Sequence, residues 1–245
     1  SKSSSFARSS KREFEAEEIE LKSFPDLAAI QDIEARENCS FKFISASEGF
    51  TQIVADTVKY TFDREGKLEK FQAIKNAKMI DQGEKAEEQR LISAETFIIE
   101  GNTDLLQVKG KAPFEATISS SVSEVLAEEF TFFLDKKDLE GKSGVKVVLK
   151  PKEGEENLGI FSKKQPVFIR ADKMRYFDEQ KRFLFNGNIK AWQEKKVLFA
   201  AEIDLSEQTR KMACAGKVRC VLPHKAKEEK EEMIEITSER MLYEP

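Results

Sequence analysis

Residues 167–191 read VFIRADKMRYFDEQKRFLFNGNIKA, and the apolar positions in this stretch change phase partway along. Ile169 and Ala171 alternate with polar residues, which is typical of a strand with one buried face. Continued alternation would place Lys173 on that face, but Met174 starts a second alternating series one residue out of step. A strand that turns a corner and still packs against the same interior needs an extra residue at the corner. The stretch therefore predicts a bent strand.

The same pattern occurs six times along the chain. Each copy has an apolar residue, a spacer, Ala or Ser, two mostly polar residues, and two apolar residues one position apart. The Ala or Ser positions are 55, 94, 127, 171, 200 and 238, at intervals of 39, 33, 44, 29 and 38 residues. A second alternating segment follows each of the first five copies, often with a Gly that marks a bulge or bend. We therefore expect an internal repeat of two bent strands that return antiparallel through a polar turn.

Acidic residues follow the Ala or Ser in five copies: Asp56, Glu95, Glu128, Asp172 and Glu239. Regularly placed carboxylates could serve catalysis or calcium binding. General acid–base catalysis needs two carboxyl groups about 5–10 Å apart at one site, whereas these acids would lie on the outside of successive bends. The fifth copy has alanine, Ala201, in this slot. We therefore interpret the acids as structural.

Composition limits the size of the fold and the partner classes. The 245 residues suit one large β domain or two small ones. The chain has 19 Phe against 3 Tyr and 1 Trp, which favours an interior of large apolar rings without polar atoms. The net charge is −4, from 41 basic and 45 acidic residues, and no basic stripe is present. Nucleic acid is therefore not expected as a partner, because binding phosphates needs clustered Lys and Arg.

Candidate catalytic and metal-binding residues are few. Cys214 and Cys220 would lie about 20 Å apart on one face of one strand, and a disulfide bridges Cα atoms up to about 7 Å apart. These two should therefore not pair with each other, and the redox state of all three cysteines, including Cys39, is left open. The single histidine, His224, lies in a charged segment, and no metal-ligand spacing or phosphate-binding loop is present. We expect no catalytic residues, no metal, no cofactor and no enzymatic activity.

Two segments resemble a known family: IRADKMRYFDEQKRFLFNGNIKAW (169–192) and LFAAEIDLSEQTRKMACAGKVRCVL (198–222). They are similar to the OstA-like repeat of periplasmic lipopolysaccharide-transport proteins. In that family A-D-x-M-x-Y leads to G-N-V, then to a second A-D/E segment and A-x-G-x-V. The matching segments here are 171–176, 187–189, 200–205 and 213–218. The opening EFEAEEIELKSF (13–24) resembles the start of the LptC-like member, so the chain could be LptA-like, LptC-like or a fusion of both.

The resemblance implies an all-β fold: an elongated antiparallel half-open jelly roll (β-taco) of stacked bent strands with an apolar trough. It implies a non-enzymatic periplasmic carrier that shields the acyl chains of lipopolysaccharide between the inner and outer membranes, powered by an inner-membrane ABC transporter. We expect a flexible tail at 1–12, LptC-like repeats at 13–162, and LptA-like repeats at 163–245 that continue from the first part. The chain begins at Ser1 and not at Met, which leaves open an inner-membrane anchor before it.

The trough would be lined by the apolar residues on the inner side of the bent strands. These lipid-binding candidates are Phe97, Ile99, Phe130, Phe132, Ile169, Met174, Tyr176, Phe183, Phe185, Ile189, Ile203, Leu205 and Val218. The same alternation describes a fully packed core equally well, so core filling and lipid contact both remain open for each position. One buried CH₂ is worth about 0.8 kcal/mol, so acyl chains need a continuous apolar surface to lie on.

The sixth copy ends the sequence without its returning strand. Its inner residues, Ile234, Ile236, Met241 and Tyr243, would form a free edge. An exposed edge strand can pair with another chain, and we expect head-to-tail pairing with other transport-bridge proteins. The alternative is that residues beyond Pro245 complete the repeat.

Two other classes of protein are alternatives to a lipid carrier. A polysaccharide-binding β-solenoid would need regular rungs of about 20–25 residues and a cleft of converging carboxylates, and neither pattern is present. A ligand-free structural β protein of the cell envelope stays open, because a trough and a packed core share one pattern. Residues 119–130 would also suit a helical face, but the repeat match over 125–132 favours a strand.

Overall fold

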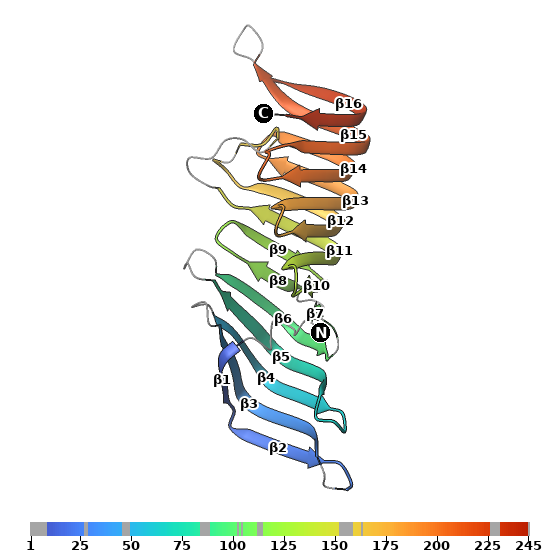
Figure 1. Ribbon diagram of the computed structural model, residues 1–245. Helices are drawn as coiled ribbons and strands as arrows, with labels where there is room; N and C mark the ends of the chain where they lie inside the picture. Colours follow the sequence, from blue (N-terminus) through green and yellow to red (C-terminus); the bar gives the residue numbers. More distant parts are fainter. Residues whose placement is uncertain are drawn as a thin grey trace. The chain divides into compact units, whose positions relative to one another are not determined.

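Antiparallel strands make up most of the described chain (Figure 1). The computed structural model describes residues 9–26, 29–45, 50–83, 89–101, 103, 105–111, 115–151, 159–162, 164–225 and 231–244. The strands are β1 (Ser9–Glu15), β2 (Glu18–Ser23), β3 (Ile30–Ser45), β4 (Phe50–Phe62), β5 (Leu68–Gln82), β6 (Arg90–Glu100), β7 (Leu105–Lys109), β8 (Ala116–Ser119), β9 (Ser123–Ala127), β10 (Glu129–Phe133), β11 (Asp138–Leu149), β12 (Val167–Phe177), β13 (Arg182–Gln193), β14 (Lys196–Ser206), β15 (Met212–Lys225) and β16 (Glu231–Tyr243). Within these ranges no helix is long and apolar enough to cross a membrane.

The predicted all-β antiparallel class is confirmed. Sixteen strands form in the described residues, and every strand pairing given for them is antiparallel. Residues 119–130, for which the sequence also allowed a helix, contain the end of β8, all of β9 and the start of β10. The predicted tail at 1–12 overlaps β1, which begins at Ser9, and residues 1–8 of that tail lie outside the described residues.

The chain divides into two compact units. Unit 1 contains residues Ser1–Ser121 and Glu128–Lys137, and unit 2 contains Val122–Ala127 and Asp138–Pro245. In unit 1 the sheet order is β3-β4-β5-β6-β7-β10, with β1 and β2 both paired to β3 and β8 paired to β6. In unit 2 the order is β11-β12-β13-β14-β15-β16, with β9 paired to β11. The sequence-based division at 162/163 concerns family resemblance and stays a prediction.

The phase slip in the opening stretch lies at a corner of β12. Ala171 and Met174 are both buried, whereas Asp172 and Lys173 between them are exposed. The pairing register with β13 shifts at the same place, between Arg170 and Lys173. A side chain on the concave side before the bend is therefore followed by another on the concave side after it, as the slip predicted.

At each corner, the strand paired with the one that carries the slip has one more residue than its partner. From Lys173↔Asn186 to Arg170↔Lys190, β12 advances three residues and β13 advances four. The same difference occurs between β4 and β5 and between β14 and β15. The strands with the additional residue each have two consecutive residues of positive φ: Glu37 and Asn38 in β3, Lys75 and Asn76 in β5, Ser143 and Gly144 in β11, Gly187 and Asn188 in β13, and Gly216 and Lys217 in β15.

Acidic side chains of the repeat hold these corners together. Asn188 Nδ2 donates a hydrogen bond to Asp172 Oδ2 at 2.8 Å, and Asn76 Nδ2 donates to Asp56 Oδ2 at 3.0 Å. Each pair joins the corner of one strand to the left-handed corner of the next strand. The structural interpretation is therefore supported for Asp56 and Asp172, whose carboxylates bind the asparagines of the bends.

Candidate functional site

The inner apolar face of each unit is built from cross-strand rows of side chains. In unit 1 one row consists of successive partners that are all buried: Ala35, Val58, Ala73, Phe97, Val108 and Phe130. In unit 2 the row Met174, Phe185, Ile203 and Cys214 is likewise buried. Small and large residues alternate along the row in unit 1, which lets facing layers interdigitate. Each unit therefore has an apolar interior that runs from strand to strand.

The predicted trough residues lie on these inner faces. Twelve of the thirteen are buried: Phe97, Ile99, Phe130, Phe132, Ile169, Met174, Phe183, Phe185, Ile189, Ile203, Leu205 and Val218. Tyr176 is half-buried, with its ring centroid 4.5 Å from that of Phe183. The structure thus places these side chains on the apolar inner face of their own unit, four in unit 1 and nine in unit 2. Their contact with lipid stays a prediction.

The apolar face becomes exposed at β16, the last strand of unit 2. Ile236 is the partner of buried Cys220, yet 49% of its surface is exposed. Ile234 is exposed too, whereas Met241 and Tyr243 are half-buried. In unit 1 the partly unpaired strand β2 has the same property, since Leu21 is 60% exposed although its partner Ile33 is half-buried. Each unit therefore presents part of its inner apolar row to solvent at one end strand.

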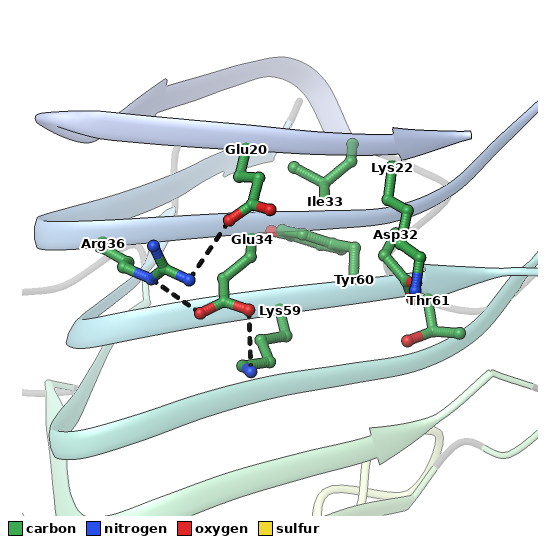
Figure 2. A pocket seen from close by; sticks show the side chains of 9 residues that line it. All are labelled: Glu20, Lys22, Asp32, Ile33, Glu34, Arg36, Lys59, Tyr60 and Thr61. Atoms are coloured by element: carbon green, nitrogen blue, oxygen red, sulfur yellow. Dashed lines mark hydrogen bonds and ion pairs between the residues drawn. The ribbon is translucent and has the colours of Figure 1, made fainter.

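A shallow pocket of about 340 Å³ lies over β2, β3 and β4 (Figure 2). It is lined mainly by charged side chains of alternate positions, including Lys22, Asp32 and Glu34, with Tyr60 and Thr61. Positive and negative groups are mixed in its wall, so it does not select a ligand of one charge. We do not assign a function to this pocket.

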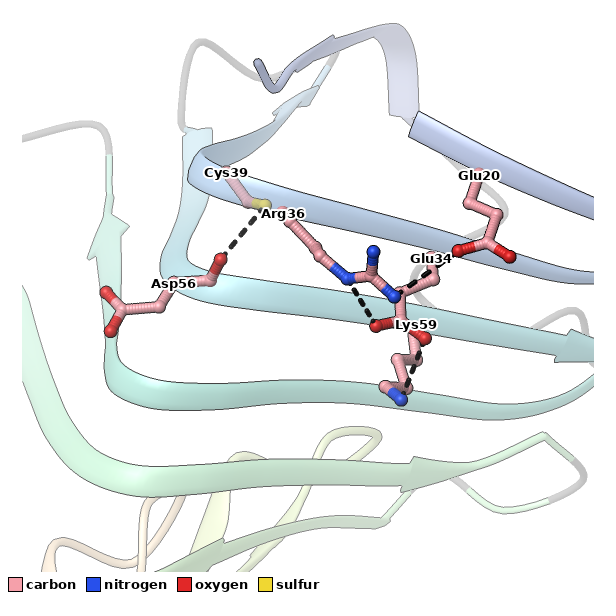
Figure 3. A network of polar contacts seen from close by, with 6 residues as sticks. All are labelled: Glu20, Glu34, Arg36, Cys39, Asp56 and Lys59. Atoms are coloured by element: carbon pink, nitrogen blue, oxygen red, sulfur yellow. Dashed lines mark hydrogen bonds and ion pairs between the residues drawn. The ribbon is translucent and has the colours of Figure 1, made fainter. Parts of the chain in front are cut away.

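The pocket wall contains a network of ion pairs centred on Glu34 (Figure 3). Lys59 Nζ lies 2.8 Å from Glu34 Oε2, Arg36 Nε lies 2.9 Å from Oε1, and Arg36 also reaches Glu20. The hydrogen bond from Lys59 lowers the pKa of Glu34 most. Both oxygens of Glu34 thus face cations, which favours the charged form of this carboxylate. Solvent-exposed pairs are worth up to about 1 kcal/mol each, so the network adds modest links between β3 and β4 through Lys59 and between β2 and β3 through Glu20.

The cysteines are buried free thiols. Burial, with a smaller effect of Cys220, raises the pKa of Cys214 from 9.0 to about 12. Burial likewise raises the pKa of Cys39, whose thiol donates to the backbone oxygen of Asp56 at 3.7 Å (Figure 3). The thiolate is the reactive form, so the raised pKa values lower the reactive fraction of these thiols at neutral pH. No cluster of metal-ligating side chains occurs among the residues that the structure describes.

Sequence reasoning missed two buried polar residues, Asp138 and Gln193. Gln193 is only 2% exposed, and its side chain bonds to the backbone of Ser162 and Gln165. The signal was present: Ile189 and Ala191 point inward, and alternation places Gln193 on the same face. A buried polar residue at an inward position implies a hydrogen-bonding partner inside the fold.

Comparison with solved structures finds several chains of similar fold. The chain is similar to LptH from Pseudomonas aeruginosa, the LptA-homologous periplasmic component of the lipopolysaccharide transport device. The identity is 11%, the TM-score is 0.43, and the match covers 59% of this chain and 93% of LptH. No protein-family model and no curated protein sequence matches the chain. The family to which the chain belongs is therefore part of the proposal below.

Proposed function

We propose that the chain is a non-enzymatic periplasmic lipid carrier that shields the acyl chains of lipopolysaccharide or a related glycolipid during transport from the inner to the outer membrane. Its interior would accept acyl chains between the two arms of the bent strands, while sugars and phosphates stay in water. The OstA-like sequence motifs support this assignment to the lipopolysaccharide-transport family.

One observation carries the proposal: an inner row of unit 2 stays apolar from strand to strand. The row through Ile169, Ala191, Leu198 and Cys220 is buried, and it continues to Ile236 of β16. Apolar groups are stabilised on such a surface by about 25 cal/mol per Å² that leaves water. A continuous apolar row therefore suits a carrier that passes acyl chains from strand to strand.

Photo-crosslinking tests the lipid site at two neighbouring aromatic positions. Tyr176 is half-buried on the inner face, and Phe177 is half-buried on the outer face with Arg175 and Arg182 over its ring. A benzoylphenylalanine at position 176 should label purified lipopolysaccharide on irradiation, because its ring lies beside the acyl path. The same group at position 177 should label far less.

Equal labelling at the two positions would overturn the lipid site. Absence of labelling at both, together with a native mass spectrum without bound amphiphile, would favour the ligand-free structural β protein. Both variants differ from the parent by one aromatic replacement of similar exposure. A difference between them therefore reports on the face of the sheet and not on the size of the new ring.

The exposed edge of β16 would serve head-to-tail pairing with a second bridge protein. Replacing Ile236 with glutamate should weaken self-association at least about tenfold, because the junction would bury an unpaired charge. The matched control is Thr237→Glu, which faces outward opposite Arg219 and should leave association unchanged. Sedimentation equilibrium over a wide concentration range gives both constants. If Ile236→Glu associates as well as the parent, β16 is not the docking edge.

A further inference from the structure

Residues 159–162, here called the strap, lie between β11 and β12 and belong to neither strand. The strap nevertheless contributes to the interior of unit 2, because its Phe161 side chain is only 3% exposed. Phe161 is thus a core side chain supplied from outside the bent strands. The question is what holds it there and what would replace it if it left.

The strap is bonded to the tips of β13 and β14 through its backbone. Gln193 Oε1 accepts a hydrogen bond from Ser162 N at 2.7 Å, and Gln193 Nε2 donates to Ser162 O and Gln165 O at 2.5 and 2.9 Å. Lys196 Nζ donates to Ile160 O at 2.8 Å. Two polar side chains from one arm of the sheet therefore grip the strap.

The other end of the strap contacts the opposite arm. A Cβ placed on Gly159 would lie 2.8 Å from Sδ and Cε of Met212. Met212 begins β15 and is the inner-row partner of Leu205, so these two residues lie on one arm of the bent strands. Gln193 and Lys196 are cross-strand partners on the other arm. The strap therefore spans from one arm of unit 2 to the other, with Phe161 between its two contacts.

We propose that Phe161 fills a binding site for one acyl chain of an anionic amphiphile, and that the strap leaves when the chain enters. This inference rests on the proposed function and adds to it the location of one acyl-chain site. The displaced Phe161 ring would be exchanged for a hydrocarbon chain against Met212 and the inner rows. The anchors are side chains of the sheet whose partners are backbone atoms of the strap and of Gln165, outside the strands, so strap release leaves the strand pairing intact.

Lys196 gives the site a preference for a negative head group. It forms no ion pair with a carboxylate among the residues that the structure describes, and its bonded partner is the strap carbonyl of Ile160. Strap departure removes that partner and leaves an ammonium at the mouth of the interior. Its charge already acts inward, since it opposes the rise that burial gives to the pKa of Cys220. A phosphate or carboxylate head group would take the place of the carbonyl.

Binding of cis-parinaric acid, an 18-carbon fluorescent fatty acid, tests the site. Phe161→Ala and Gln193→Leu should each bind it about tenfold more tightly than the parent, because a binding-competent state that is rarely populated lowers apparent affinity in proportion. The two variants act independently, one on the occupant and one on its anchor. The matched control Phe168→Ala removes an outer-face ring of the same unit and should leave the affinity unchanged.

The head-group preference and strap movement have their own readouts. In the Phe161→Ala background, adding Lys196→Gln should abolish the preference for parinaric acid over its uncharged methyl ester. In the parent, saturating probe should speed hydrogen exchange of the Ser162 amide, which now donates to Gln193. Equal affinity of all variants, with unchanged Ser162 exchange, would reject the strap site while the carrier function stands. Failure of every variant to bind the probe would reject both.

Discussion

Phe185→Ala should lower the free energy of unfolding of unit 2 by about 3–5 kcal/mol, the usual cost of truncating a fully buried Phe. Phe185 has no exposed surface, and its cross-strand partners Met174 and Ile203 are buried as well. The deletion therefore leaves a cavity between side chains that have little room to move. Urea unfolding followed by the fluorescence of Trp192 measures this, because the single Trp lies on β13 with Phe185.

The matched control is Leu184→Ala on the outer face of the same strand. Leu184 is half-buried and lies between Arg175 and Asp204, so its loss should cost about 1 kcal/mol or less. Equal costs at positions 184 and 185 would contradict the packed interior. They would indicate that Phe185 borders open space in solution, which is the arrangement expected of an empty trough.

Gly216→Ala should destabilise unit 2 by about 2–4 kcal/mol, for two separate reasons. Gly216 has φ +76°, a left-handed backbone that costs an L residue on the order of 1 kcal/mol. A Cβ there would also lie 2.7 Å from Cβ of Ala201 on the neighbouring strand. Neither β carbon can rotate away, so the strands must move apart at the corner. The same Trp192 fluorescence transition reports the loss.

Two variants separate the contact from the backbone strain. Gly144→Ala has nearly the same φ, +73°, but nothing lies within 4 Å of the added Cβ, so it should cost only about 1 kcal/mol. Ala201→Gly combined with Gly216→Ala should recover the difference, since the second β carbon is gone. If Gly144→Ala and Gly216→Ala cost the same, the close approach of positions 201 and 216 is not a constraint on the corner.

Much of this architecture could be predicted from the alternation of apolar and polar residues, which places every second side chain on the same face of a strand. The slip at Ala171 and Met174 correctly gave a bent strand, and the six copies gave an all-β antiparallel chain. The same alternation also placed Phe183, Phe185 and Val218 on the inner face. These predictions succeed because one buried face fixes the register of a strand, and a shift by one residue would expose every apolar side chain.

Other features depend on contacts that the pattern does not contain. The clean alternation of Phe185, Gly187 and Ile189 conceals the additional residue of β13, because Gly187 and Asn188 turn the chain instead of presenting side chains. Whether the interior is filled or open depends on how closely two arms approach, and both states have the same sequence period. The strap is unpredictable for a similar reason, since Phe161 lies outside the repeat and is held in place by contacts with residues distant in sequence, Gln193 and Lys196.

The alternation of two corner types sets the smallest step by which such a protein can change length. In β11 to β15 every second strand carries the pair of left-handed residues, and the strands between carry the simple slip. A single inserted strand would place two left-handed corners, or two slip corners, next to each other. A corner asparagine such as Asn188 or a glycine such as Gly216 would then lose its partner on the adjacent strand, Asp172 or Ala201. A duplicated hairpin keeps the alternation, and adds two strand spacings, or about 10 Å. Strands are therefore expected to be inserted or deleted in this fold as whole hairpins and not singly.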